Sequence, residues 1–350
     1  MDVENYGSVE SEILINAGGI LNHPQMPQIK GLSSFSGPLL HTACWDGSVD
    51  LTDKRVAVIG AGASAIQLVP QIQKQCRHVD VYIRTPSWIT PPVVNVSQEQ
   101  EGEQKQDRNL NPEYRQDEIE KFRNNSGAYL QMRKELDNTL NGKFRAYFKK
   151  SPEQRDVRAQ FEERMKQLIP NKELQEKLIP GFEVGCRRIN PGEAYLEALQ
   201  KDNVEPVFEP IKEIITDGLL VGNSTGTSHR PADILIAATG FNTSFKPRIP
   251  IIGLDSVNLQ DKWASNPVSY MGLAVAGYPN YLIFLGPNTP ISNGSLMGMC
   301  PFLFVQIMTT DPCITLDRTP RGNQRLFHSP PPQGYSRTCS NLQNKPRGPA

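Results

Sequence analysis

Short apolar runs alternate with polar stretches along the first part of the chain, in the pattern of a sheet covered by helices. Residues 12–19 form an apolar run that ends in small residues, as buried parallel strands do where the backbone comes close to a ligand. Residues 54–60 and 79–85 are two further strand-like runs, and residues 63–75 between them are apolar at helical spacing. The pattern predicts a complete strand, turn, helix and strand unit.

The pattern changes between residues 97 and 178, where runs rich in Glu, Lys, Arg and Gln predict solvated helices inserted in the domain. Strand-like runs return at residues 204–208, 233–238 and 281–288. Beyond about residue 308 both periodicity and apolar content are lost. This predicts a disordered tail.

Composition narrows the class of protein. The chain has 350 residues, with 37 Lys and Arg against 37 Asp and Glu, so its neutral charge gives no case for a nucleic-acid partner. No apolar run approaches the roughly 20 residues that span a bilayer, and the polar start of the chain is unlike a signal peptide. The six cysteines are scattered without metal-like spacing. These features predict a cytoplasmic α/β protein without a membrane span or a metal.

The glycine-rich turn after residue 59 has the form G-x-G-x-x-A. Gly60 permits a tight turn, Gly62 lets the backbone approach a pyrophosphate, and Ala65 allows close packing of helix on strand. The helix N-terminus offers free N–H groups to the phosphates, and the Ser64 hydroxyl is a further donor. The predicted nucleotide contacts at this turn are Gly60, Gly62, Ala63, Ser64, Ala65 and Gln67.

The end of the next strand indicates which nucleotide binds. An acidic residue there would bind a ribose 2′-hydroxyl and indicate NAD, but this strand ends in Arg84 and Thr85. A guanidinium suits the 2′-phosphate of NADP. The alternative is a surface Arg at the end of a strand. Together with the turn, Arg84 favours NADP.

A second motif lies just before the glycine turn. Residues 35–46 read Phe-Ser-Gly-Pro-Leu-Leu-His-Thr-Ala-Cys-Trp-Asp, which has the form F-x-G-x-x-x-H-x-x-x-W-D. In this order and separation, the two motifs resemble the signature of the Baeyer–Villiger monooxygenases, which use FAD and NADPH. The resemblance implies that His41 is a conformational hinge between two nucleotide-binding domains; a structural histidine is the overlapping alternative. Phe35 and Trp45 are interpreted as packing anchors, and Gly37 as a site of close backbone approach.

The resemblance gives roles to later residues as well. Arg187 and Arg188, which alone would read as surface charge, match a basic pair of the family. Arg187 would then contact the 2′-phosphate, although the family usually has Lys there. Arg188 would be the catalytic Arg, a fixed cation that stabilises negative charge in the reaction. Thr239 and Gly240 lie in an Ala-Thr-Gly-Phe turn that resembles the passage between domains in such flavoproteins, and residues 286–289 resemble a late flavin-side segment.

The expected organisation follows the family. Residues 1–50 would be a remnant of an FAD domain with the fingerprint linker, residues 51–240 an NADP-binding domain with a helical insertion at about 97–180, residues 241–308 a return to the FAD domain, and residues 309–350 a disordered tail. The fold class is thus a Rossmann-like NADP-binding domain with a helical insertion and a partial FAD domain. The family's first glycine motif, which binds FAD, has no counterpart before the fingerprint.

Three hypotheses for function remain. The first is an FAD- and NADPH-dependent monooxygenase that inserts oxygen from O2 into a small-molecule ketone, in secondary metabolite biosynthesis by resemblance. The second is a truncated, non-catalytic NADPH-binding remnant of such an enzyme. A flavin N- or S-oxygenase is a third option, which Trp45 and Asp46 at the end of the fingerprint make less favourable.

Overall fold

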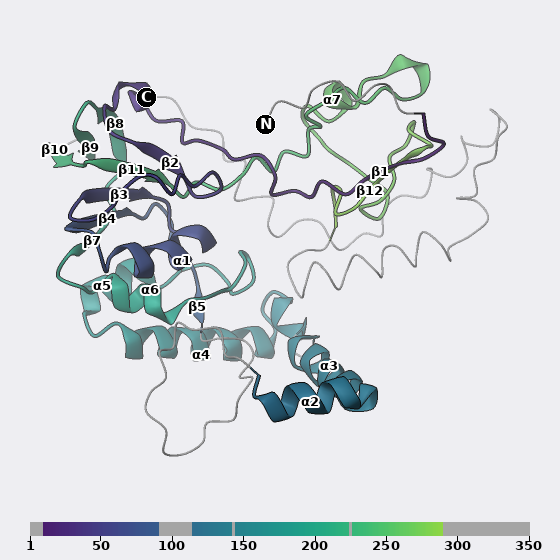
Figure 1. Cartoon of the computed structure of the whole chain (residues 1–350), viewed down its shortest axis with the longest axis horizontal. Helices are drawn as coiled ribbons and strands as arrows, with labels where there is room; N and C mark the ends of the chain where they lie inside the picture. Colours follow the sequence, from purple (N-terminus) through teal and green to yellow (C-terminus); the bar gives the residue numbers. More distant parts are fainter. Residues whose placement is uncertain (1–9, 91–113, 142–143, 224–225, 290–350) are drawn as a thin grey trace. The chain divides into compact units, whose positions relative to one another are not determined.

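The computed structural model describes residues 10–90, 114–141, 144–223 and 226–289 (Figure 1). The chain divides into two compact units. One runs from Pro24 to Gly240, and the other joins the segment up to His23 with the segment from Phe241 onward. Among the described residues, no helix combines the length and the apolar character needed to cross a membrane.

A five-stranded parallel sheet forms the centre of the 24–240 unit. Its strands stand in the order β2-β11-β3-β4-β7. Their side chains are largely buried on both faces, which explains why the sequence shows continuous apolar runs rather than alternation. The strands are β2 (Leu39–His41), β3 (Arg55–Ile59), β4 (His78–Tyr82), β7 (Val204–Val207) and β11 (Ile234–Ala237).

Helices cover one face of this sheet (Figure 1). The helix α1 (Ala63–Ile72) follows β3 as predicted and packs against α6 (Glu193–Ala198). Ile66 and Val69 of α1 are buried in one core with side chains of β3, β4 and α6. The long α4 (Pro152–Leu168) contributes Met165 to the same core.

An antiparallel sheet covers the opposite face. It consists of β8 (Ile211–Ile215), β9 (Gly218–Asn223) and β10 (Gly226–Pro231) in the order β10-β9-β8. Its buried side chains form a second core with residues of β3 and β4, and the 3-10 helix η1 (Leu32–Ser34) packs at its edge. The sequence did not predict this layer as a separate sheet.

The charged segment is helical, as predicted. Its described elements are α2 (Gln116–Asn124), α3 (Ser126–Asn141), η2 (Phe144–Tyr147), α4 and α5 (Lys172–Leu178). Two short strands, β5 (Ile89–Thr90) and β6 (Asn190–Pro191), pair in parallel and join the two ends of this segment. The part of the predicted insertion from residue 97 to 113 lies outside the described residues.

The second unit is built around a short parallel pair, β1 (Leu14–Asn16) with β12 (Tyr281–Ile283). It also contains η3 (Leu254–Ser256) and α7 (Leu259–Lys262), whose Leu259 packs with Trp263 and Tyr278. The apolar run at β1 is not buried as expected: Leu14 is 53% exposed, because β1 has only β12 as a strand partner among the described residues. The predicted tail lies outside those residues.

In this division, residues 24–50 lie within the 24–240 unit. From the sequence, residues 1–50 were expected to form a remnant of an FAD domain together with the fingerprint linker. Residues 24–50 are joined to the larger unit because β2 pairs with β11, with His41 opposite Ala237.

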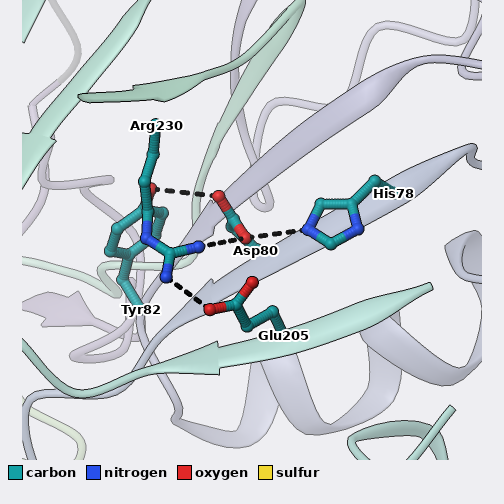
Figure 2. Close-up of polar contacts among 5 residues, drawn as sticks. All are labelled: His78, Asp80, Tyr82, Glu205 and Arg230. Atoms are coloured by element: carbon teal, nitrogen blue, oxygen red, sulfur yellow. Dashed lines mark hydrogen bonds and ion pairs between the residues drawn. The ribbon is translucent and has the colours of Figure 1, made fainter. Parts of the chain in front are cut away.

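An ion cluster ties the antiparallel sheet to the parallel one (Figure 2). The Asp80 side chain on β4 is 7% exposed, and its Oδ1 accepts from Arg230 of β10 at 3.1 Å and contacts Nε2 of His78 at 3.0 Å. Arg230 also donates to Glu205 of β7. Burial and the neighbouring Asp80 carboxylate raise the pKa of the Tyr82 hydroxyl. Arg230 therefore links three strands from two layers.

We expect Arg230→Met to lower the free energy of unfolding by about 2–3 kcal/mol, because it leaves the buried Asp80 carboxylate without its guanidinium partner. The hydrogen bond from Arg230 lowers the pKa of Glu205 in the folded protein, so this part of the stabilisation is present above the ordinary Glu pKa of about 4.3 and is lost as pH falls through the folded value. Urea unfolding at several pH values should show that the difference in unfolding free energy between wild type and variant becomes smaller as the pH falls below about 4.3. A constant gap would contradict the assignment.

Candidate nucleotide-binding site

The tight turn after β3 requires glycine at its first position. Gly60 has φ 123°, and a Cβ there would lie 2.4 Å from the carbonyl oxygen of Ala238. The reason is local, since β11 runs beside β3 and leaves the sheet at the same place. A side chain at residue 60 would push the two chain exits apart.

The second glycine opens the turn toward solvent. Gly62 is the N-cap of α1, with φ −87°, and a Cβ added to it would meet no described atom within 4 Å. The first turn of a helix leaves N–H groups without intrahelical partners, and these begin at Ala63. Ser64 is half-buried, and Ala65 is fully buried against the sheet. Open space beside free N–H groups is the geometry that suits a phosphate.

Four chain exits meet at one edge of the parallel sheet. Ile59 is paired with both Tyr82 and Ala237, and Ala237 is paired in turn with His41. The residues that follow these positions therefore stand side by side. The structure thus brings together the glycine turn, Arg84, the Thr239–Gly240 turn and His41, which the sequence analysis had assigned separately.

The Arg84 loop is bonded directly to the glycine turn. The Gly60 N–H donates to the Tyr82 carbonyl oxygen at 3.1 Å, and Ser87 Oγ donates to the Ala61 carbonyl oxygen at 3.0 Å. Arg84 is exposed between these two bonds, and Thr85 is half-buried. Ser87 was not among the residues predicted from the sequence. Its hydroxyl, three residues after Arg84, could have been considered as a hydrogen-bond donor near the turn.

The pairing of β5 with β6 brings the segment that carries Arg187 and Arg188 next to the segment that follows Arg84. The Asn190 N–H donates to the Trp88 carbonyl oxygen at 3.2 Å, and Gly192 N–H donates to Thr90 at 3.1 Å. Because Trp88 follows Arg84 by four residues and Asn190 follows Arg188 by two, the two basic segments run into adjacent strands. Arg187 and Arg188 are both exposed, and the guanidinium of Arg187 lies 5.5 Å from the Phe182 ring centroid.

His41 is buried at the end of β2. Its Nδ1 accepts a hydrogen bond from the Ala43 N–H at 3.0 Å, which assigns the ring proton to Nε2 in the neutral imidazole. Nearby, a Cβ on Gly37 would lie 2.2 Å from the Asp233 carbonyl oxygen, so the expected close backbone approach is present. Phe35 packs against the second core, whereas Trp45 is 44% exposed and is not a packing anchor in the described chain.

Three other residues that were predicted to contact the nucleotide form hydrogen bonds within the protein. Thr239 Oγ1 donates to the Gln25 carbonyl oxygen at 2.5 Å, and Gly240 accepts from the Gln25 N–H at 3.0 Å. Gln67 is exposed on α1, and its amide donates to the Ala63 carbonyl oxygen at 3.0 Å. These bonds shape the turn, and only the Gln67 amide could turn toward a bound nucleotide without disturbing the fold.

The ion cluster of Figure 2 is a different kind of site. Ligand atoms of His78, Asp80 and Glu205 lie within 4.8 Å of one another, close enough to hold a metal ion. However, Arg230 already contacts both carboxylates, and a metal cation would stand against its positive charge. We therefore assign this cluster a structural role. It borders a cavity of about 480 Å³ that Arg55 also lines.

Parallel sheet, glycine turn and helix N-terminus together define a dinucleotide-binding α/β unit. Comparison with known proteins shows which enzymes this chain is related to. The chain is 38% identical over 289 residues to an FAD-binding monooxygenase of Dothistroma septosporum, covering 81% of this chain and 44% of that one. It is 32% identical to a Baeyer–Villiger monooxygenase of Pseudomonas aeruginosa, over 82% of this chain and 51% of that one.

Solved structures agree with this relationship. A crystal structure of the protein OTEMO in complex with FAD and NADP matches with a TM-score of 0.70 and 26% identity, over 87% of this chain and 61% of that chain. No family model matches the chain. The resemblance to Baeyer–Villiger and related FAD-binding monooxygenases is thus confirmed. The chain spans about half the length of the relatives described.

The two glycines of the turn should respond differently to alanine. Gly60→Ala should lower the free energy of unfolding by about 1–3 kcal/mol, through a strained positive φ and the contact with Ala238. Gly62→Ala should leave stability within about 0.5 kcal/mol, because its added methyl meets open space. Denaturant unfolding of both variants measures the difference, and equal losses would contradict the geometry described for the turn.

Proposed function

We propose that this chain supplies the NADPH-binding unit of an FAD- and NADPH-dependent Baeyer–Villiger monooxygenase. Such an enzyme inserts one oxygen atom of O2 into a ketone to give an ester or lactone. One observation carries the proposal: Ser87 fastens the loop of Arg84 to the glycine turn at the N-terminus of α1. The relatives' names supply the class of reaction.

The described residues fit NADPH. The pyrophosphate would lie on the N–H groups of the first turn of α1, in the open space beside Gly62. The 2′-phosphate would accept hydrogen bonds from the exposed guanidinium of Arg84, with Arg187 as a second cation from the adjacent segment. Bound NADPH supplies a hydride to a flavin.

Arg188 would act by charge. As an always-protonated guanidinium on an exposed segment beside the nucleotide, it would stabilise the negative charge that develops during oxygen transfer. His41 is buried and bonded to the backbone of its own loop, which suits a positioning role better than proton transfer. It would hold the end of β2 against β11.

FAD enters the proposal through the relatives. Among the described residues, the contacts form one glycine turn of the dinucleotide type and do not define a flavin site. A second candidate function is NADPH binding without catalysis, which the glycine turn and the Arg84 loop would support by themselves. The remaining parts of the proposal are a ketone of secondary metabolism as substrate and a cytoplasmic location; these rest on the family resemblance and the composition.

Purification separates the two candidates. A protein that retains FAD and oxidises NADPH faster when a ketone is added supports the monooxygenase. A colourless protein that takes up no added FAD, but is thermally stabilised by NADPH and not by NADH, supports the binding function. A protein that NADPH does not stabilise contradicts both.

Arg84→Ala should weaken NADPH binding about tenfold or more, because a charge-assisted hydrogen bond contributes about 1.5–3 kcal/mol. The affinity for NADH should stay unchanged, since NADH has no 2′-phosphate. Arg77→Ala is the matched control: Arg77 is exposed just before the same strand, at its opposite end. Isothermal titration with both nucleotides measures the effect, and a parallel loss of NADH affinity would refute the role of Arg84.

A further inference from the structure

Polar side chains of α4 point inward, onto the segment that carries Arg187 and Arg188. Gln154 is 2% exposed, and its Nε2 donates to the carbonyl oxygens of Ala146 at 2.7 Å and Val184 at 2.8 Å. From the sequence, the polar and charged residues of this helical segment were expected at the surface. Gln154 instead fixes the backbone three residues before Arg187.

Residues from α4, from η2 and from the chain before β5 hold the segment at residues 182–185. The Trp88 indole donates to the Phe182 carbonyl oxygen at 3.1 Å. Arg158 of α4 lies with its guanidinium 6.0 Å from the Trp88 ring centroid and 3.7 Å from the Glu183 carboxylate. A Cβ on Gly185 would also lie 2.6 Å from the Tyr147 ring. The entry to the basic pair is therefore closely packed.

The exit from the basic pair is held by an ion pair. Arg164 of α4 donates to Glu193 through two parallel bonds, Nε to Oε1 at 2.6 Å and Nη2 to Oε2 at 2.9 Å. Glu193 is the first residue of α6, and its side chain is 5% exposed. Immediately before it, a Cβ on Gly192 would lie 2.3 Å from Ile66 of α1, the helix that starts at the glycine turn.

We propose that Arg164 and Glu193 are positioning residues, which hold Arg187 and Arg188 at the nucleotide site. This rests on the proposed function. The bonds at Val184 and Glu193 fix both ends of a short segment, and the basic pair lies between them. A bidentate Arg–carboxylate pair sets direction as well as distance. Ordering the segment before the nucleotide arrives lowers the entropy lost on binding.

The alternative is that the pair only stabilises the packing of α4 on α6. Both roles predict a loss of stability when the pair is broken, so stability does not separate them. They differ in two respects: local order between residues 183 and 192, and discrimination between NADPH and NADH by the protein that remains folded.

Glu193→Gln is the test variant, since it removes the charge and keeps the shape. Arg164→Lys is a second variant, which keeps the charge but has no bidentate fork. Glu173→Gln is the matched control, because Glu173 accepts a hydrogen bond from Lys177 at 2.7 Å in an i, i+4 ion pair on α5, away from the contacts named above. Unchanged amide exchange in β3 shows that each variant is folded.

Hydrogen–deuterium exchange and nucleotide titration then give the result. We expect exchange over residues 183–192 to rise about tenfold in Glu193→Gln, and NADPH affinity to fall about three- to tenfold, the cost of ordering one or two long side chains. NADH affinity and the control should not change, and Arg164→Lys should fall between.

Exchange at 183–192 equal to wild type, or equal losses of NADPH and NADH affinity, would overturn the positioning role. If wild type binds neither nucleotide, the proposed function fails. The exchange measurement then still decides whether the pair holds the segment.

Discussion

The parallel pairing of β3 with β11 on one side and β4 on the other is the constraint on which the site depends. This register sets the ends of the strands level, with Ile59 opposite both Ala237 and Tyr82. Three chain exits then leave the sheet together, so closely that the carbonyl oxygen of Ala238 excludes a side chain at residue 60. The glycine turn is thus a consequence of strand pairing, and its open space beside Gly62 follows from the same geometry.

The two faces of the sheet serve different purposes. On one face, Arg230 joins the antiparallel sheet to β4 and β7 through buried or half-exposed carboxylates. On the other face, α4 does more than cover the core. Its polar residues Gln154 and Arg164 contact both ends of the segment that carries the basic pair. Polar and charged residues of a helical insertion can therefore hold a neighbouring segment in place as well as contact solvent.

The main strands, α1 and the helical insertion could be predicted from the sequence, because apolar periodicity and glycine spacing are local signals. The candidate residues Gly60, Arg84 and His41 were named from their motifs, but their meeting at one edge of the sheet depends on the order of the strands, which only the structure gives. Other contacts could not be predicted. Ser87 with Ala61, Arg164 with Glu193, and Arg230 with Asp80 are separated by 26, 29 and 150 residues, and no local pattern records such partners. The exposure of Leu14 was also unpredictable, since it depends on which strands are available to pair with β1.

Nuclear magnetic resonance of the deuterated, ¹⁵N-labelled chain titrated with NADP⁺ tests the assignment of the nucleotide site most directly. We expect the largest amide shifts at residues 60–66 and 84–87, with a second set at residues 186–190. Shifts confined to the cavity that Arg55 and Ser228 line, or no shifts at a concentration of nucleotide that saturates related enzymes, would contradict it.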